Sequence, residues 1–142
     1  MNATIAIATR YAWRFVGRPY RWGGDDPMAG FDCSGLCIEI LQSVGILPRR
    51  FDTTAHGLFH KFPRAGYGAP GCLVFWHGSV KSKIIHVEFC IGDGLAIGAS
   101  GGGSRTTTTE DAIRQNAFVK IRPVASRDGV AGYADPFSGG RF

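Results

Sequence analysis

The stretch GFDCSGLC, residues 30–37, places two cysteines one helical turn apart, directly after a loop-forming segment. That segment, residues 18–32, is rich in glycine, proline and aspartate, which favour turns. From about Cys33 to Val44 apolar residues cover most of a helical circumference and predict a buried helix. Because Cys33 begins this helix, its thiol would meet the positive end of the helix dipole, which lowers the pKa of a cysteine. Other interpretations of Cys33 are half of a metal site, half of a disulfide, or a core residue.

The predicted secondary structure changes from helices to strands near residue 65. Before it, a helix is predicted over residues 3–16 and a short one from Thr53 or Thr54 through His60. After it come short, partly alternating runs typical of strands. These runs are CLVFWHG (72–78), KIIHVEFCI (83–91), LAIGAS (95–100) and FVKIRPV (118–124). Helices followed by an antiparallel meander predict an α+β fold.

The connecting segments are also predicted from composition. Gly92-Asp93-Gly94 separates two of the β-type runs and indicates a hairpin. Residues 100–109, SGGGSRTTTT, are expected to form a loop, because they match no phosphate-binding motif. Residues 128–142 are rich in glycine and aromatic residues and are expected to pack along the surface as a tail.

Length and charge narrow the class of protein. A chain of 142 residues fits one domain over residues 1–142, and we expect a monomer. With 16 Lys and Arg against 11 Asp and Glu, the net charge of +5 favours an anionic partner such as a cell-wall polymer. The basic residues are scattered, which argues against nucleic acid as that partner. No apolar run approaches the ~20 residues of a membrane span, and the N-terminal residues do not resemble a secretory signal. These features predict synthesis in the cytoplasm and no stable membrane insertion.

A nucleophilic cysteine requires a base, and His86 is the best placed of the four histidines. It lies in the middle of a predicted strand. Alternation places His86, Glu88 and Cys90 on one face of that strand and Val87 on the other. We expect the face with His86 to meet the helix that carries Cys33.

The remaining cysteines are expected to have structural rather than catalytic roles. In the cytoplasm the four cysteines are expected to be thiols, so no disulfide framework is predicted. Cys37, Cys72 and Cys90 are expected in the core. A rival hypothesis is a structural zinc site formed by Cys33, Cys37, His86 and Cys90, although their spacings differ from the usual zinc motifs. The preferred interpretation of Cys33 as a nucleophile requires no metal and no cofactor.

Three motifs together resemble one known family. RPYRWGG (18–24), GFDCSGL (30–36) and the later His-Val strand with its Gly-x-Gly turn are similar to the NlpC-type cell-wall cysteine peptidases. These are papain-like enzymes that cut the peptide stems of peptidoglycan. The similarity runs from about Tyr11 to Ser100 and implies that Cys33 is the nucleophile and His86 the general base.

The resemblance also assigns residues around the nucleophile. Tyr20, Asp32 and Ser34 match positions that shape the site, and the last two often hold the free amine or polar end of the stem peptide. Trp22 lies in the same loop and could line a substrate groove, although packing is the simpler role for it.

The sequence departs from the family pattern at two positions. The residue that usually orients the histidine lies twelve positions after it, where this chain has Gly98, and Cys72 replaces an aspartate. If Ile91 and Leu95 close the hairpin, His86 faces Ser100 and Glu88 faces Gly98. Our hypothesis is that Glu88 replaces the missing residue and holds the imidazole tautomer. The alternative is a solvated Glu88, with water or a backbone carbonyl orienting His86.

The resemblance implies a peptidoglycan endopeptidase, most often specific for the bond between D-glutamate and the diamino acid. A compact enzyme without a signal resembles a phage lysin or a tail-associated peptidase, with phage tail proteins as partners and the cell wall reached after release. A role in recycling imported muropeptides also fits. An N-acetylmuramoyl-L-alanine amidase, an acyltransferase, and an inactive module that binds the wall or a partner remain alternatives.

Overall fold

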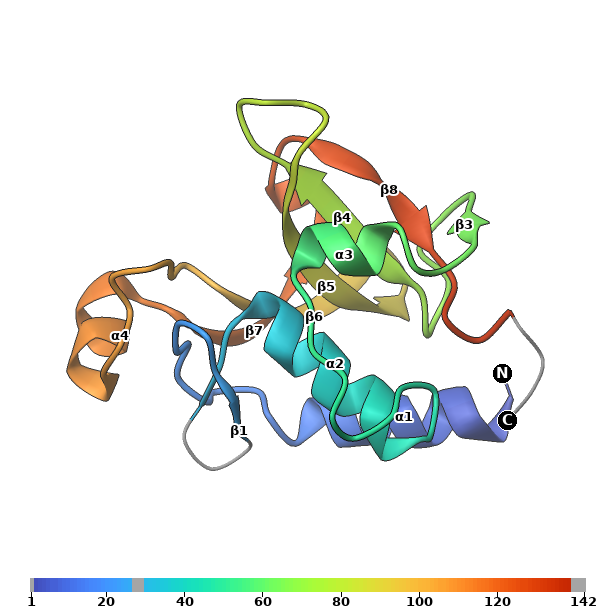
Figure 1. Cartoon of the computed structure of the whole chain (residues 1–142), viewed down its shortest axis with the longest axis horizontal. Coiled ribbons are helices and arrows are strands. Elements are labelled where there is room, and N and C mark those ends of the chain that lie inside the picture. Colours follow the sequence, from blue (N-terminus) through green and yellow to red (C-terminus); the bar gives the residue numbers. More distant parts are fainter. Residues whose placement is uncertain (1, 27–29, 139–142) are drawn as a thin grey trace.

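The computed structural model describes residues 2–26 and 30–138, so the end of the predicted tail, residues 139–142, lies outside the described part (Figure 1). The helices are α1 (Ala3–Trp13), α2 (Cys33–Ser43), α3 (Ala55–Phe59), α4 (Thr109–Gln115) and the 3-10 turn η1 (Val124–Ser126). The strands are β1 (Asp25–Asp26), β2 (Gly30–Phe31), β3 (Arg64–Ala65), β4 (Leu73–His77), β5 (Ile84–Gly92), β6 (Leu95–Ser100), β7 (Phe118–Pro123) and β8 (Val130–Ala134).

The α+β prediction is confirmed by the order of these elements. Within the described residues, six strands form an antiparallel sheet in the order β3-β8-β4-β5-β6-β7. The main core lies between one face of this sheet and the helices α1, α2 and α3, as Figure 1 shows. No helix of residues 2–26 and 30–138 combines the length and apolar character that a membrane crossing requires.

Local signals set the two ends of α2. The carboxylate of Asp32 caps the helix by accepting from the backbone N–H of Gly35 at 2.8 Å. Gly35 has no room for a side chain, because a Cβ there would lie 2.0 Å from the carbonyl oxygen of Gly24. The helix ends before Gly45, whose φ of +79° is typical of the residue that follows a helix. The predicted helix start at Cys33 is therefore confirmed.

The β5–β6 hairpin follows the predicted register except at its turn. Phe89 pairs with Ile97 and Cys90 with Ala96, as expected. At the turn, however, Gly92 pairs with Leu95 across a bulge, so the predicted closing pair of Ile91 and Leu95 is wrong. The bulge adds one residue next to the two glycines and shifts pairing only at that end.

Two elements differ from the sequence prediction. The tail was expected on the surface, but β8 is inserted between β3 and β4 and pairs with both. Its sequence, VAGYA, is short and contains a glycine, so its strand character depends on partners far away in the chain. Helix α4 follows the predicted loop and was not anticipated. A capping box between Thr108 and Asp111 begins it.

Candidate active site

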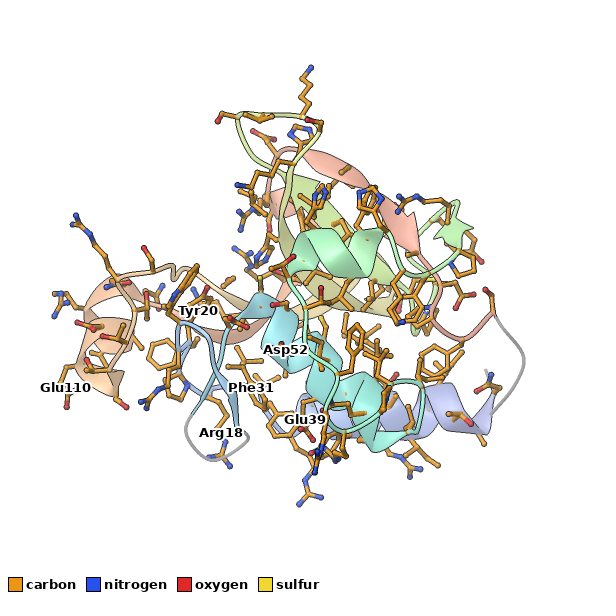
Figure 2. All side chains as sticks on the ribbon, in the orientation of Figure 1. Arg18, Tyr20, Phe31, Glu39, Asp52 and Glu110 are labelled. Atoms are coloured by element: carbon orange, nitrogen blue, oxygen red, sulfur yellow. The ribbon has the colours of Figure 1, made fainter. Side chains whose placement is uncertain are left out.

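The beginning of α2 opens into a groove of about 660 Å³. Five residues predicted for the site from the N-terminal half line this groove: Tyr20, Trp22, Asp32, Cys33 and Ser34. The opposite wall comes from the segment before α3 and from the start of β5. Figure 2 shows Tyr20 beside the beginning of α2. The structure thus brings together residues from the loop, the helix cap and a strand.

Asp32 ties the loop to the helix. One carboxylate oxygen accepts from the N–H of Gly35, and the other accepts from the N–H of Gly23 at 3.0 Å. The hydroxyl of Ser34 lies 3.4 Å from the first of these oxygens. Burial raises the pKa of Asp32, and these hydrogen bonds act in the opposite direction. Asp32 is therefore held in a fixed orientation at the floor of the groove.

Tyr20 and Trp22 form one wall of the groove, and residues 101–106 support them. Tyr20 is buried against Gly102, where a Cβ would lie 2.4 Å from Cδ1 of the ring. Burial, followed by Cys33 and Asp32, raises the pKa of Tyr20. The N–H of Trp22 donates to the carbonyl of Thr106 at 2.7 Å, and the indole ring itself is exposed.

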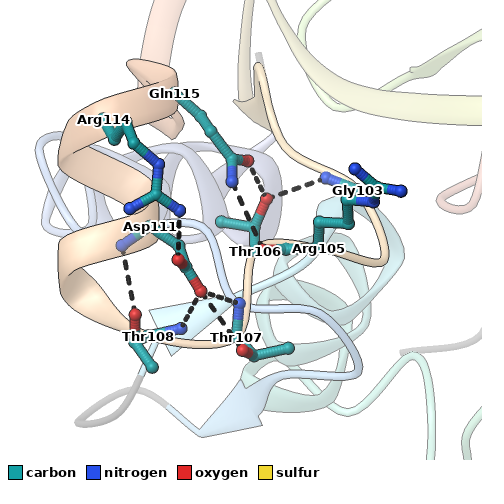
Figure 3. Close-up of polar contacts among 8 residues, drawn as sticks. All are labelled: Gly103, Arg105, Thr106, Thr107, Thr108, Asp111, Arg114 and Gln115. Atoms are coloured by element: carbon teal, nitrogen blue, oxygen red, sulfur yellow. Dashed lines mark hydrogen bonds and ion pairs between the residues drawn. The ribbon is translucent and has the colours of Figure 1, made fainter.

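Thr106 connects this wall to α4, as Figure 3 shows. Its buried hydroxyl accepts from the N–H of Gly103 at 3.0 Å and donates to the side chain of Gln115. Helix α4 in turn is anchored by Asp111, which accepts from the backbone at Thr107 and Thr108. The unpredicted helix therefore fixes the loop on which Trp22 rests.

The pKa of the Cys33 thiol is raised, whereas the helix dipole was expected to lower it. Burial raises the pKa of Cys33 to about 11, and the neighbouring Asp32 also raises it. The backbone N–H groups of Val87 and Ser34 lower the pKa, but desolvation is the larger effect. The helix terminus alone therefore does not produce a thiolate, and Cys33 needs a partner that accepts its proton.

His86 and Glu88 form a buried pair on β5. Nε2 of His86 lies 2.6 Å from Oε2 of Glu88. The Glu88 side chain lies over Gly98, where a Cβ would approach Cγ of Glu88 to 2.2 Å. This contact confirms the predicted proximity of Glu88 to Gly98, and the alternative of a solvated Glu88 is wrong. Burial lowers the pKa of His86, while Glu88 raises it.

The prediction that the face of β5 with His86 meets α2 is wrong. Val87 and Phe89 of this strand pack in the main core, which also contains α2. The ring centroid of His86 lies 5.2 Å from that of Trp76. Trp76 belongs to a second, smaller apolar cluster. Alternation was read correctly, but it does not tell which face of a strand a helix covers. Within the described residues no hydrogen bond joins Cys33 to His86. Cys33 reaches β5 one residue away, at the N–H of Val87.

The recorded β5–β6 pairing runs from Phe89–Ile97 to the turn, so the expected pairing of His86 with Ser100 is not found. The hydroxyl of Ser100 is buried and has no hydrogen-bond partner among the described residues.

The other cysteines behave as core residues. Cys37, Cys72 and Cys90 are buried and all four cysteines are free, which confirms the interpretation of these three as packing residues. Residues 2–26 and 30–138 contain no group of three His, Cys, Asp or Glu side chains arranged to hold a metal ion. The zinc hypothesis thus has no geometric support.

Sequence reasoning missed three charged residues near the site. Asp52 and Lys83 line the groove, and Arg122 of β7 lies 3.3 Å from Oε2 of Glu88. Asp52 and Lys83 belong to no motif. Arg122 alternates with apolar residues in its strand, so the sequence indicates its face but not its partner.

A helix that presents a cysteine to a groove, beside an antiparallel strand with a buried His–Glu pair, is the arrangement of a papain-like fold. A sequence profile of the NlpC/P60 family matches residues 17–123, and the chain belongs to this family.

Two curated relatives show the extent of the similarity. The chain is 37% identical over 93 residues to the bifunctional muramidase/DL-endopeptidase CwlT of Bacillus subtilis, covering 65% of the chain and 28% of that protein. It is 32% identical over 134 residues to the murein DD-endopeptidase MepH of Escherichia coli, covering 87% of the chain and 48% of that protein. The chain thus spans less than half the length of these relatives.

Solved structures agree with the fold. The crystal structure of an NlpC/P60 family protein from Bacillus cereus superimposes with a TM-score of 0.72 at 26% identity, over 92% of this chain and 39% of the other. The predicted papain-like fold is therefore confirmed.

Proposed function

We propose that this protein is a peptidoglycan hydrolase that cuts stem peptides with Cys33 as nucleophile and His86 as general base. The observation that carries the proposal is the placement of Cys33 at the start of α2, in a groove, with its sulfur against β5 one residue from a buried histidine. Membership of the NlpC/P60 family supports the same chemistry. Both named relatives are endopeptidases.

The acylation step requires Nδ1 of His86, which Glu88 leaves free, to come within hydrogen-bond reach of the Cys33 thiol and take its proton. The thiolate attacks the carbonyl carbon of the stem amide, and the electron pair of the C=O bond moves to oxygen. Backbone N–H groups at the start of α2 stabilise this oxyanion. The C–N bond then breaks, and His86 gives its proton to the leaving amine.

Hydrolysis releases the enzyme. His86 takes a proton from water, the hydroxide attacks the thioester carbonyl, and the C–S bond breaks. The proton returns to the Cys33 sulfur. In both steps Glu88 acts on the imidazole: it holds the tautomer with a proton on Nε2 and stabilises the imidazolium that forms.

The groove suggests how the stem peptide is bound. The partly buried carboxylate of Asp32, with Ser34 beside it, would receive the free amine of the stem. Tyr20 and the exposed indole of Trp22 form the wall along the peptide. We assign the D-glutamyl to diamino acid bond as the scissile bond. Delivery to the wall as a phage lysin or a tail-associated enzyme, with tail proteins as partners, completes the proposal.

The test is digestion of purified peptidoglycan by wild type and Cys33→Ala, with products identified by mass spectrometry under reducing conditions. We expect peptide fragments from wild type only, with masses that identify the bond. Cys37→Ala is the matched control, because Cys37 lies one turn further along the same helix but in the core. Release of free stems cut at the muramoyl–alanine bond would instead indicate an amidase, and transfer to an added amine would indicate an acyltransferase.

A second candidate is a module that binds peptidoglycan without cutting it. The raised pKa of Cys33 and the missing hydrogen bond between Cys33 and His86 within the described residues favour it. In that case wild type and Cys33→Ala would sediment equally with insoluble peptidoglycan, and neither would release fragments.

A further inference from the structure

One carboxylate oxygen of Glu88 has two partners. Oε2 lies 2.6 Å from Nε2 of His86 and 3.3 Å from Nη2 of Arg122. The Glu88 side chain is only 2% exposed, whereas that of Arg122 is 31% exposed. A buried carboxylate is costly unless its charge and its hydrogen-bonding capacity are matched. Arg122 is the cation that provides this match within residues 2–26 and 30–138.

The path from Arg122 to Glu88 crosses β6 at two small residues, Ala96 and Gly98. Arg122 belongs to β7 and Glu88 to β5, and β6 lies between them. Arg122 pairs with Ala96 of β6, and the Glu88 side chain occupies the space above Gly98. A larger residue at Gly98 would meet Glu88, and a larger residue at Ala96 would lie beside the arginine. These two small residues therefore allow the contact across β6.

We propose that Arg122 is a positioning residue that acts through Glu88 on His86. The guanidinium holds the carboxylate over Gly98 with Oε2 directed at Nε2, so that the imidazole keeps its Nε2 proton and leaves Nδ1 free to accept another. This inference rests on the proposed function of His86 as the base. It concerns neither the nucleophile nor the substrate groove.

The charge of Arg122 also affects the base itself. Burial lowers the pKa of His86 first, Glu88 raises it, and the positive charges of Arg127 and Arg122 lower it further. Glu88 also acts on the thiols of Cys33, Cys37 and Cys90, where its charge adds to the effect of burial and raises each pKa. Arg122 therefore adds to the effect of burial, which is the main cause of the lowered pKa of His86, while its positive charge lies against the carboxylate of Glu88.

The experiment compares Arg122→Met with Lys120→Met by two measurements. Lys120 lies on the same strand, pairs with Gly98 and donates to the carbonyl of Asn116. Its replacement removes the same charge and leaves the ion pair of Arg122 with Glu88 in place. The first measurement is the pKa of His86 from an imidazole ¹⁵N NMR titration, with the signal assigned from His86→Gln. The second is the pH profile of kcat and KM on a synthetic stem peptide.

For Arg122→Met we expect the pKa of His86 to rise by about one pH unit, because a nearby positive charge is lost. The acidic limb of kcat/KM should shift in the same direction, and kcat should fall about tenfold with KM unchanged. Lys120→Met should leave both properties as in wild type. Arg122→Lys should keep the His86 pKa close to that of wild type, because the charge remains.

Equal His86 titrations in wild type and Arg122→Met would overturn the inference, even if the variant were less stable. So would an equal shift in Lys120→Met, since a general charge effect would then explain it. The titration requires no turnover. If wild type proves inactive, the proposed function fails, while the coupling of Arg122 to His86 is still measured.

Discussion

Gly98 stands where the resemblance to the family implies a residue that orients the histidine, and another side chain fills the space beside it. The volume that a side chain at this position would fill is taken by Glu88, which comes from the neighbouring strand and bonds to Nε2 of His86. In the proposed function this carboxylate, two residues after the histidine on the same face of β5, substitutes for the orienting residue expected on β6. Only glycine at 98 allows this exchange.

Gly98→Ala should therefore affect both stability and activity. The new Cβ would lie 2.2 Å from Cγ of Glu88, so the carboxylate must move away from His86. We expect a loss of about 2 kcal/mol in the free energy of unfolding, measured with urea, and a large fall in kcat. Gly103→Ala is the control, because no atom lies within 4 Å of a Cβ there. Normal activity of Gly98→Ala would show that the Glu88 position is not required.

The titration of His86 predicts the pH dependence of activity. Burial is the largest influence on its pKa and lowers it below the ordinary value near 6.5. The base is then already neutral at neutral pH, so kcat/KM should rise with pH below about 6.5 and reach a plateau above it. The measurement is the kcat/KM profile on a stem peptide. An acidic limb centred above pH 7 would contradict the assignment of His86 as the base.

The same shift has a consequence for stability. Because the folded pKa of His86 is lower than the unfolded pKa, the unfolded chain binds the proton more tightly. The contribution to stability is complete above the unfolded pKa and is lost as the pH falls through the folded value.

Among the elements, α1 and α2 are joined by a buried polar contact. The hydroxyl of Tyr11 donates to Glu39 at 2.7 Å, and Arg49 contacts the other carboxylate oxygen at 2.9 Å. Burial and the bond to Glu39 raise the pKa of Tyr11 to about 12. The carboxylate of Glu39, almost fully buried, depends on both partners.

Tyr11→Phe should lower the free energy of unfolding by about 1 kcal/mol, because a buried carboxylate oxygen loses its donor. Tyr67→Phe serves as the control, since Tyr67 is 72% exposed. Urea denaturation measures both variants. Equal stabilities would mean that water replaces the Tyr11 hydroxyl without cost.

The α4 connection to the groove is the second contact between elements with a measurable role. In Thr106→Val the hydroxyl that links Gly103 to Gln115 is lost while the shape of the side chain is kept. We expect faster amide hydrogen exchange at Trp22, about 2 kcal/mol lower stability and a higher KM. Thr109→Val, at an exposed position, should match wild type. An unchanged KM would show that the contact between Thr106 and α4 does not affect substrate binding.

At the scale of the whole molecule, β8 joins the short strand β3 to the rest of the sheet. It lies between β3 and β4, and its residues pair with Leu73, Val74, Phe75 and Trp76 of β4. Strand β4 also carries the ring that contacts His86. The C-terminal segment therefore supports the strand next to the proposed base.

Deletion of residues 129–142 should prevent folding, because it leaves the edge of β4 that faces β8 unpaired over buried apolar residues. Circular dichroism and size-exclusion chromatography would report a disordered or aggregated chain. A truncated protein that unfolds cooperatively with the free energy of wild type would show that β8 is dispensable.

Several features were predictable because their signals are local. Asp32 before Cys33 and Gly45 after Val44 set the ends of α2, and the Gly-Asp-Gly turn set the β5–β6 hairpin. The proximity of Glu88 to Gly98 followed from counting residues across that hairpin. By contrast, α4 was missed because its capping box stands in a run of threonines that suggested a loop, although Asp111 is a recognisable signal.

The amino-acid sequence by itself determined where α2 begins, which residues alternate on β5 and how the hairpin aligns them, since caps, period-two patterns and glycine turns act within a few residues. Only the tertiary structure decided that Val87, and not His86, faces α2, that burial outweighs the helix dipole at Cys33, and that Arg122 reaches Glu88. These outcomes depend on which distant segments exclude water from one another and which charges they bring together. No local pattern in the chain contains that information.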